Sequence, residues 1–217
     1  MTIWTGHDAR HVIDVDVVTV STAVEPANGE LDAARRAGVV VAGRPDIMEA
    51  LARGQRTLAV SGTHGKTTTS AMAALVARAV GWDPSFIIGG VVHQLGTGAR
   101  WTGSGRFVVE ADESDSSFLR FGAEDVIVTN IEADHLDHHG SMEALERAFD
   151  RFVTQGTGVK VLCADDPGTV ALHARVAPVT QGALWTYGTA DGADYRIVGL
   201  STSGMRTAFS VDRKSVV

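Results

Sequence analysis

The stretch Thr57-Leu58-Ala59-Val60-Ser61-Gly62-Thr63-His64-Gly65-Lys66-Thr67-Thr68-Thr69 decides the fold of this chain. Its apolar first part predicts a buried strand over residues 57–61, and a helical pattern follows over 67–80. Glycines in the turn between them allow backbone N–H groups to approach phosphate oxygens, and the start of a helix adds a positive dipole. The stretch therefore predicts a phosphate-binding loop over residues 61–68.

Within this loop, Lys66 supplies a mobile cation and Thr67 supplies a hydroxyl suited to Mg²⁺. We expect Lys66 to face the phosphates and not the core. The general phosphate-loop pattern begins with a glycine at the position that Val60 occupies here, so a plain glycine and threonine turn stays an alternative. The predicted nucleotide-binding residues of the loop are Gly62, Thr63, His64, Gly65, Lys66, Thr67 and Thr68.

The rest of the chain alternates short β-branched runs with helical patterns, which predicts an α/β fold with a mostly parallel sheet. Strands are predicted at residues 15–20, 39–42, 57–61, 107–109, 126–129 and 159–163, and helices at 28–37, 45–53, 67–80, 142–152 and 169–174. In the helix after the loop, Met72, Leu75, Val76 and Ala79 are predicted to face the core. After Gly182, short runs at 183–187, 194–200 and 206–211 predict a meander at the sheet edge. A domain boundary is predicted in the polar segment 51–56.

Composition excludes several classes of protein. The chain has 217 residues, 44% of them hydrophobic, and a net charge of -7, which argues against nonspecific nucleic-acid binding. No apolar run approaches the roughly 20 residues that a membrane span needs, and the N-terminus carries no secretory pattern, so cytoplasmic residence is expected. Cys163 is the single cysteine, which rules out a disulfide within the chain.

Carboxylates and histidines follow two of the predicted strands. Glu110 comes directly after residues 107–109, at the strand end where open α/β sheets place ligands, and a carboxylate beside the Thr67 hydroxyl suits Mg²⁺. Glu113 is left open between a functional residue and part of a solvated acidic loop. The dense run Asp134-His135-Leu136-Asp137-His138-His139 also fits a two-metal phosphoesterase, which is the rival enzymatic hypothesis.

Three motifs resemble those of the Mur ligases. They are Gly62-Thr63-His64-Gly65-Lys66-Thr67-Thr68-Thr69, Glu110-Ala111-Asp112-Glu113-Ser114-Asp115 and Thr129-Asn130-Ile131-Glu132-Ala133-Asp134-His135-Leu136-Asp137. The resemblance implies that residues 57–217 are an incomplete P-loop-type, ATP-binding central domain. It implies that residues 1–56 are the second half of a Rossmann-like UDP-sugar-binding domain, and that the C-terminal domain is absent. We therefore expect a reading frame truncated at both ends.

The resemblance also implies roles for single residues. The histidine that matches His135 helps the Mur ligases to hold a second Mg²⁺, and the asparagine that matches Asn130 lines the nucleotide site. His138 and His139 do not belong to that pattern and are predicted to be surface residues. The implied catalytic residues are Lys66, Glu110 and His135, and the implied metal ligands are Thr67, Glu110 and His135. Substrate contacts are implied for His7, Ser21, Thr22 and Asn28 in the first domain, and for Ser116 and Arg120 in the second.

The implied activity is an ATP- and Mg²⁺-dependent ligation in peptidoglycan precursor synthesis. In it, a carboxylate attacks the γ-phosphate of ATP, and an amine captures the resulting acyl phosphate. Ser114 favours the branch of the family that joins L-alanine to UDP-N-acetylmuramate over the branch that recycles a tripeptide, which tends to carry tyrosine in this motif. A nucleotide-binding module without turnover is the non-enzymatic alternative. We expect this chain alone to hold phosphate without completing the ligation.

Overall fold

The computed structural model describes residues 2–21, 23–114, 116–134 and 136–214. The chain divides into two compact units, Met1–Leu51 and Ala52–Val217. The division falls within the segment 51–56, where the sequence predicts a boundary. No helix in the described ranges is both long and apolar enough to cross a membrane.

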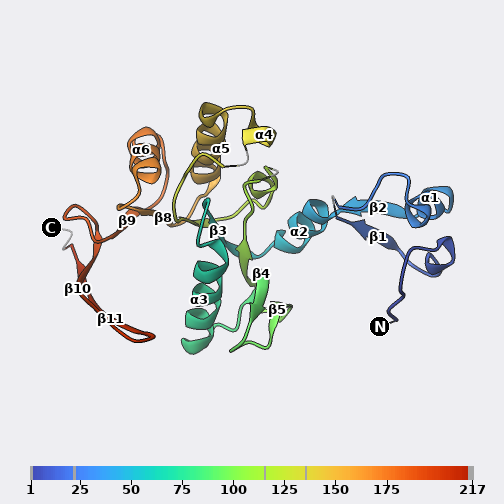
Figure 1. Ribbon diagram of the computed structural model, residues 1–217, viewed down its shortest axis with the longest axis horizontal. Helices are drawn as coiled ribbons and strands as arrows, with labels where there is room; N and C mark the ends of the chain where they lie inside the picture. The colour runs from blue at the N-terminus through green and yellow to red at the C-terminus, as the bar shows by residue number, and fades with distance from the viewer. Residues whose placement is uncertain (1, 22, 115, 135, 215–217) are drawn as a thin grey trace. The chain divides into compact units, whose positions relative to one another are not determined.

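The first unit is built around a parallel pair of strands (Figure 1). Its elements are the 3-10 helix η1 (Ala9–His11), β1 (Val17–Val20), α1 (Gly29–Arg36), β2 (Val40–Gly43) and α2 (Arg44–Ala52). Helix α1 connects the two strands, and Asn28 caps it by accepting a hydrogen bond from the backbone N–H of Glu30. Leu31 and Ala34 are its buried residues, and they lie on one face because they are three positions apart. The unit is therefore a βαβ arrangement, as the alternating pattern predicts.

The second unit is built on a sheet whose strand order, within the described residues, is β11-β10-β9-β8-β7-β3-β6-β4-β5. Its strands are β3 (Arg56–Ser61), β4 (Ser85–Val92), β5 (Thr97–Arg100), β6 (Arg106–Glu110), β7 (Asp125–Val128), β8 (Lys160–Cys163), β9 (Leu184–Gly188), β10 (Tyr195–Ser203) and β11 (Arg206–Arg213). Neighbouring strands are parallel except for β4 with β5 and β10 with β11. The mostly parallel sheet confirms the predicted fold class.

Helices lie on both faces of this sheet (Figure 1). They are α3 (Lys66–Ala79), η2 (Ser117–Arg120), α4 (Leu136–His139), α5 (Met142–Gln155) and α6 (Pro167–Val176). From β3 the chain passes through α3 toward β4, whereas from β7 it passes in the opposite direction through α5 to β8 and through α6 to β9. Because parallel crossovers are right-handed, the opposite directions place α3 on one face and α5 with α6 on the other.

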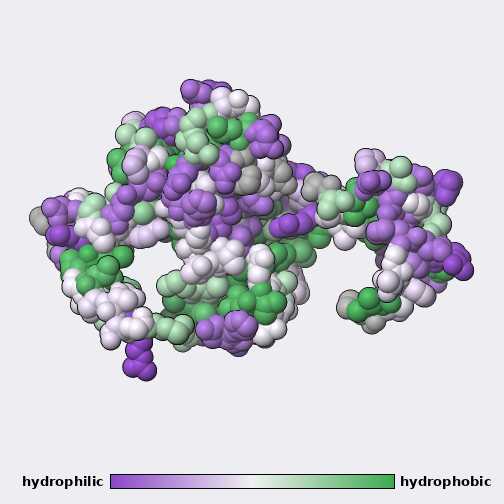
Figure 2. Space-filling view, viewed as in Figure 1, coloured by the Kyte–Doolittle hydropathy of each residue, from purple (hydrophilic) through white to green (hydrophobic). Residues whose placement is uncertain are grey.

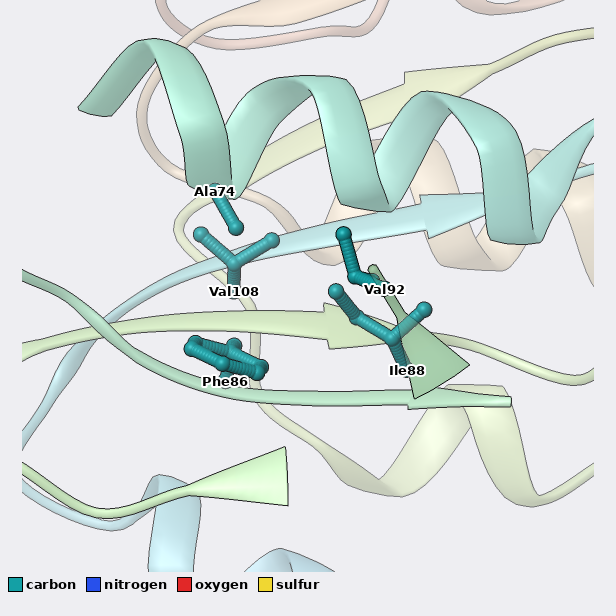
Figure 3. Packing of buried hydrophobic residues seen from close by; sticks show 5 residues of the cluster. All are labelled: Ala74, Phe86, Ile88, Val92 and Val108. Atoms are coloured by element: carbon teal, nitrogen blue, oxygen red, sulfur yellow. The ribbon is translucent and has the colours of Figure 1, made fainter. Parts of the chain in front are cut away.

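A buried cluster under α3 holds the helix that begins at the predicted loop. Its members come from α3, β4 and β6, and they are Ala74, Phe86, Ile88, Val92 and Val108 (Figure 3). Alanine at this contact lets the helix lie close to the strands, and the larger side chains of the sheet fill the space beneath it. The packing therefore fixes α3, which begins at the phosphate loop, against β4 and β6.

Of the core stripe predicted for α3, Leu75 packs against the buried cluster, but the prediction is wrong for Met72, Val76 and Ala79, which are exposed. Met72 and Val76 are 59% and 62% exposed, while the buried residues of the helix are Ser70, Ala74 and Ala77. These three small residues recur at helical spacing and occupy the face that approaches the sheet most closely. Hydrophobicity alone points to the larger residues, whereas the close approach to the sheet favours the smaller ones.

An open apolar groove of about 650 Å³ borders the exposed side of α3. Val76, Trp82 and Val161 contribute to its lining, and Figure 2 shows hydrophobic surface (green) around the lower end of α3. Arg56 and Arg106, at the starts of β3 and β6, also line it. The groove therefore lies toward the N-terminal ends of these strands, whereas the predicted phosphate loop follows the C-terminal end of β3.

Two parts of the sheet differ from the prediction. Strands β4 and β5 are not predicted, since Gly89 and Gly90 interrupt the apolar run of β4 and glycine is depleted in strands. The register of β4 against β5 also shifts between Ile87 and Val92. The three strands predicted at the sheet edge are confirmed as β9, β10 and β11, but their arrangement as a meander is wrong, because β9 pairs in parallel with both β8 and β10. Among these three strands, the antiparallel hairpin that a meander requires is formed by β10 and β11.

Candidate phosphate site at the start of α3

The loop 61–68 runs from the C-terminal end of β3 into the first turn of α3. Gly62 and Gly65 have φ angles of 132° and 82°, in the region that glycine adopts without steric cost. Gly65 is the N-cap of α3 and makes no side-chain hydrogen bond to the first turn. N–H groups at a helix start that lack such a cap attract anions, both by hydrogen bonding and through the helix dipole. The loop therefore has the geometry of a phosphate site.

Residues that follow β7 fasten this loop to the sheet. The Thr129 hydroxyl donates a hydrogen bond to the carbonyl of His64 at 2.6 Å. The Asn130 side chain donates to the same carbonyl at 3.0 Å and accepts from the His64 N–H at 2.8 Å. The Asn130 carbonyl also accepts from the N–H of Thr63 at 3.0 Å. Asn130 thus braces the loop, and its implied contact with the nucleotide stays a prediction.

Lys66 is the cation of the loop, and three acceptors hold it. Its Nζ donates to the carbonyls of Gly62 at 2.8 Å and Thr63 at 3.2 Å, and to Glu113 Oε1 at 2.9 Å. The Lys66 side chain is 14% exposed and the Glu113 side chain is 2% exposed. Lys66 therefore turns toward a buried carboxylate, and its expected contact with phosphates stays a prediction. The interpretation of Glu113 as part of a solvated loop is wrong.

Thr67 and Glu110 form a hydroxyl and carboxylate pair beside the loop. Thr67 Oγ1 donates to Glu110 Oε1 at 2.9 Å, and the backbone N–H of Gly89 donates to Glu110 Oε2 at 2.7 Å. A Cβ at position 89 would lie only 2.9 Å from Glu110 Oε1, so glycine leaves the space that the carboxylate fills. Hydroxyl and carboxylate oxygens are the hard ligands that Mg²⁺ prefers, and the pair fits a magnesium ion beside bound phosphates.

Gly89 is a neighbour of the candidate site that the sequence prediction missed. Its N–H orients the Glu110 carboxylate, and its missing side chain makes room for it. The available signal was the Gly89-Gly90 pair inside an apolar run, since glycine within a strand often marks a close approach of another group.

Two histidines of the run after β7, His138 and His139, lie close to the loop that joins β6 to η2, here called the acidic loop. His135, the implied metal ligand, lies outside the described residues. His139 Nε2 lies 2.7 Å from the carbonyl of Glu113, and His138 Nε2 lies 3.2 Å from Ser116 Oγ. His138 is exposed, as predicted, but His139 is half-buried. His139 contacts Glu113 in the acidic loop, and His138 contacts Ser116 at the end of that loop. Among the side chains that the structure describes, no group of three or more histidines, cysteines and carboxylates is arranged to hold a metal ion.

The substrate residues implied for the second unit lie at η2. Ser116 has a φ angle of 60° and precedes this 3-10 helix, and Arg120 is its exposed last residue. The positive φ of Ser116 turns the chain sharply between the acidic loop and η2. This turn brings the Ser116 hydroxyl within hydrogen-bond distance of His138. The end of the acidic loop and helix α4 therefore meet through a side-chain contact.

Of the implied UDP-sugar residues of the first unit, His7 and Asn28 both contact Glu30. His7 Nδ1 lies 2.6 Å from Glu30 Oε2, Asn28 caps α1, and Ser21 is an exposed residue after β1. Thr22 lies outside the described residues. Hydrogen bonds from His7 and then His11 lower the pKa of Glu30 below its usual value. These contacts give His7 and Asn28 structural roles and leave their substrate roles as predictions.

Comparison with known proteins settles the family. The family described as Mur ligase middle domain matches residues 60–216, which include the loop, Glu110 and the segment after β7. The chain belongs to the Mur ligase family. This Mur ligase chain is 46% identical to the UDP-N-acetylmuramate–L-alanine ligase of Kineococcus radiotolerans over 95% of its length, and 43% identical to that of Salinispora arenicola over 99%.

A solved structure agrees with this assignment. The crystal structure of UDP-N-acetylmuramate-alanine ligase MurC from Thermotoga maritima matches 96% of the Mur ligase chain with a TM-score of 0.81 and 30% identity. The chain spans 45% and 43% of the two curated relatives and 46% of the Thermotoga protein, so it covers less than half of each. Membership of the family decides against the two-metal phosphoesterase hypothesis. The family match includes the loop 61–68, and a two-metal phosphoesterase does not require such a loop.

Proposed function

We propose that this chain supplies the ATP-binding site of a ligase that joins L-alanine to UDP-N-acetylmuramate. One observation carries the proposal: the uncapped start of α3 adjoins both Lys66 and the Thr67–Glu110 oxygen pair. An anion site, a cation and hard metal ligands are the parts that phosphoryl transfer from ATP needs. The names of the curated relatives support the choice of substrates.

In this proposal, the residues of the chain position the phosphates and neutralise their charge. The N–H groups of the first turn of α3 bind phosphate oxygens, and Lys66 donates to the transferring phosphoryl group. Thr67, Glu110 and His135 would hold Mg²⁺, which neutralises phosphate charge when bound. The lactyl carboxylate of UDP-N-acetylmuramate attacks the γ-phosphate and releases ADP. The amine of L-alanine then attacks the acyl phosphate and releases inorganic phosphate.

The remaining assignments follow from the family. We propose that the first unit is part of a UDP-sugar-binding domain, with His7, Ser21, Thr22 and Asn28 near the substrate. Ser116 and Arg120 are proposed to face the substrate from the second unit, and Asn130 to line the nucleotide site. The expected cytoplasmic residence stays a prediction.

Two alternatives differ from this proposal in measurable ways. A ligase that recycles tripeptides would use the same ATP site with a different amine, and Ser114 together with the names of the relatives favours L-alanine. A nucleotide-binding module without turnover would bind phosphate and release no ADP when both substrates are added.

The proposed activity can be tested in a chimera in which this chain replaces the matching segment of the Kineococcus radiotolerans relative. We expect the chimera to release ADP and form product with Mg-ATP, UDP-N-acetylmuramate and L-alanine, because the replaced segment includes the phosphate site. The same assay with the tripeptide in place of L-alanine measures the choice of amine. A folded chimera that binds nucleotide but forms no product with either amine would refute the ligase assignment in favour of a binding module.

Glu110→Gln in the same chimera tests the metal assignment. We expect the Mg²⁺ concentration for half-maximal ligation to rise by about tenfold or more, since changes to the surroundings of a metal already cost about 10–100-fold. The amide keeps the shape of the side chain and removes its charge. His138→Ala is the matched control, because His138 is exposed and contacts Ser116 but not Glu110 or Thr67. An equal rise for both variants would contradict the assignment of Glu110 as the metal carboxylate.

A further inference from the structure

The contact between Lys66 and Glu113 leaves no hydrogen of the lysine for a phosphate. An ammonium group has three N–H donors, and the carbonyls of Gly62 and Thr63 and the carboxylate of Glu113 accept all three. The two carbonyls belong to the loop itself. A phosphate that binds Lys66 must therefore replace one of these acceptors, and Glu113 is the only anion among the three.

Glu113 is also poorly compensated without Lys66. Both of its carboxylate oxygens lie 2.9 Å from Lys66 Nζ, and among the described residues Oε1 accepts the hydrogen bond from Lys66 while Oε2 makes none. Its side chain is 2% exposed, so water does not stabilise the charge. Lys66 is its ion-pair partner among the described residues. A buried carboxylate that loses such a partner is strongly unfavourable, and the loss opposes any ligand that draws Lys66 away.

The backbone at Glu113 connects this pair to neighbouring elements. Its carbonyl lies 2.7 Å from His139 Nε2 of α4, and the N–H of Ser116 donates to the same carbonyl at 3.2 Å. The turn at Ser116 leads into η2. A displacement of the Glu113 side chain from Lys66 is therefore expected to disturb the segment between β6 and η2, and not only the phosphate loop.

We propose that Glu113 is a positioning residue that neutralises Lys66 in the empty loop and competes with phosphate for it. The proposal rests on the proposed function, since it requires that Lys66 binds phosphate. In the absence of a ligand, the carboxylate holds the ammonium over the loop carbonyls. When phosphate binds, Lys66 exchanges the carboxylate for a phosphate oxygen, and the acidic loop between β6 and η2 rearranges. Glu113 thus weakens phosphate binding while it keeps the empty site folded.

The test is the affinity of the full 217-residue chain for sodium tripolyphosphate in the presence of EDTA, measured by calorimetry. This probe carries the phosphates without adenine, and the chelator removes any role of Glu113 as a metal ligand. We expect Glu113→Gln to bind at least about threefold more tightly than the wild type, within the usual range of coupling between contacting residues. Glu132→Gln is the matched control, because its exposed carboxylate lies 3.8 Å from His64 and does not contact Lys66. We expect it to change the affinity by less than about twofold.

The same measurement in the Lys66→Ala background completes a double-mutant cycle. We expect the gain from Glu113→Gln to disappear there, because the competition acts through Lys66. Equal or weaker binding by Glu113→Gln, or a gain that persists without Lys66, would overturn the role of Glu113 and leave the phosphate site intact. Absence of binding by every variant, the wild type included, would overturn the phosphate site as well.

Hydrogen exchange of the wild type provides a second measurement that does not depend on how the variants fold. Tripolyphosphate is expected to raise amide exchange in the segment between β6 and η2, since the Glu113 side chain loses its partner there. The first turn of α3 should become more protected at the same time. Slower amide exchange in α3 without any change of amide exchange in the acidic loop would contradict the proposed exchange of partners.

Discussion

Lys66→Ala is expected to lower the affinity of the chain for Mg-ADP by at least about tenfold, and also to destabilise the fold. The affinity falls because a hydrogen bond to a charged group contributes about 1.5–3 kcal/mol. The fold is destabilised because the Glu113 carboxylate, 2% exposed, loses its cation, and breaking a buried ion pair costs about 3–5 kcal/mol. Calorimetry with Mg-ADP and urea unfolding at pH 7 measure the two effects separately.

Two further variants separate these effects of Lys66. Arg78→Ala removes an exposed cation from the same helix, and Arg78 Nε lies 3.6 Å from Asp83 Oδ1. We expect this variant to change neither the affinity for Mg-ADP nor the free energy of unfolding greatly. Lys66→Ala combined with Glu113→Gln removes the unpaired charge, so most of the stability should return while the affinity stays low. Wild-type affinity in Lys66→Ala would show that the loop is not the phosphate site.

Gly62→Ala is expected to destabilise the second unit by about 3–5 kcal/mol, from backbone strain together with a steric clash. Its φ angle of 132° lies in a region that residues with side chains rarely adopt. An added Cβ would overlap the Thr129 hydroxyl and lie 2.9 Å from the carbonyl of Asn130. Because those two residues hold the loop in place, the loop cannot move away without losing their hydrogen bonds. Urea unfolding measures the loss.

Gly65→Ala is the matched control for the close approach at Gly62. Its φ angle is also positive, at 82°, but the nearest atom to an added Cβ is Thr129 Cγ2 at 4.0 Å. Only the cost of the left-handed conformation remains, which is about 1–2 kcal/mol. Equal losses for the two variants would mean that backbone conformation, and not the packing against Thr129, makes glycine necessary at position 62.

The sequence predicts the strand, loop and helix at residues 56–79 well, because the pattern there is local. An apolar run, a glycine turn and a helical repeat all act within a few residues, and Glu110 is predicted since strand ends in a parallel sheet share one edge. The α/β class follows from the same local alternation. The family motifs add Asn130, which contacts the loop, and no local pattern distinguishes it from other polar residues after a strand. They also add His135, whose role stays a prediction.

The parts that the sequence does not predict depend on contacts between distant residues. Glu113 lies 47 positions from Lys66 in sequence, and only the folded chain shows that the two side chains pair in a buried place. Gly89 is similar, because only the folded chain shows that it contacts Glu110, 21 positions away in sequence. The buried face of α3 follows from how closely the helix approaches the sheet, so Ala74 is buried and Met72 is exposed.

A crystal structure of the 217-residue chain with Mg-ADP would test the central claim most directly. We predict that the β-phosphate lies at the loop 61–68, within hydrogen-bond distance of Lys66 Nζ and of N–H groups in the first turn of α3. We also predict the metal ion beside Thr67 Oγ1 and the Glu110 carboxylate. Nucleotide bound elsewhere, for example in the apolar groove at Val76 and Trp82, with Lys66 still paired to Glu113, would contradict the claim.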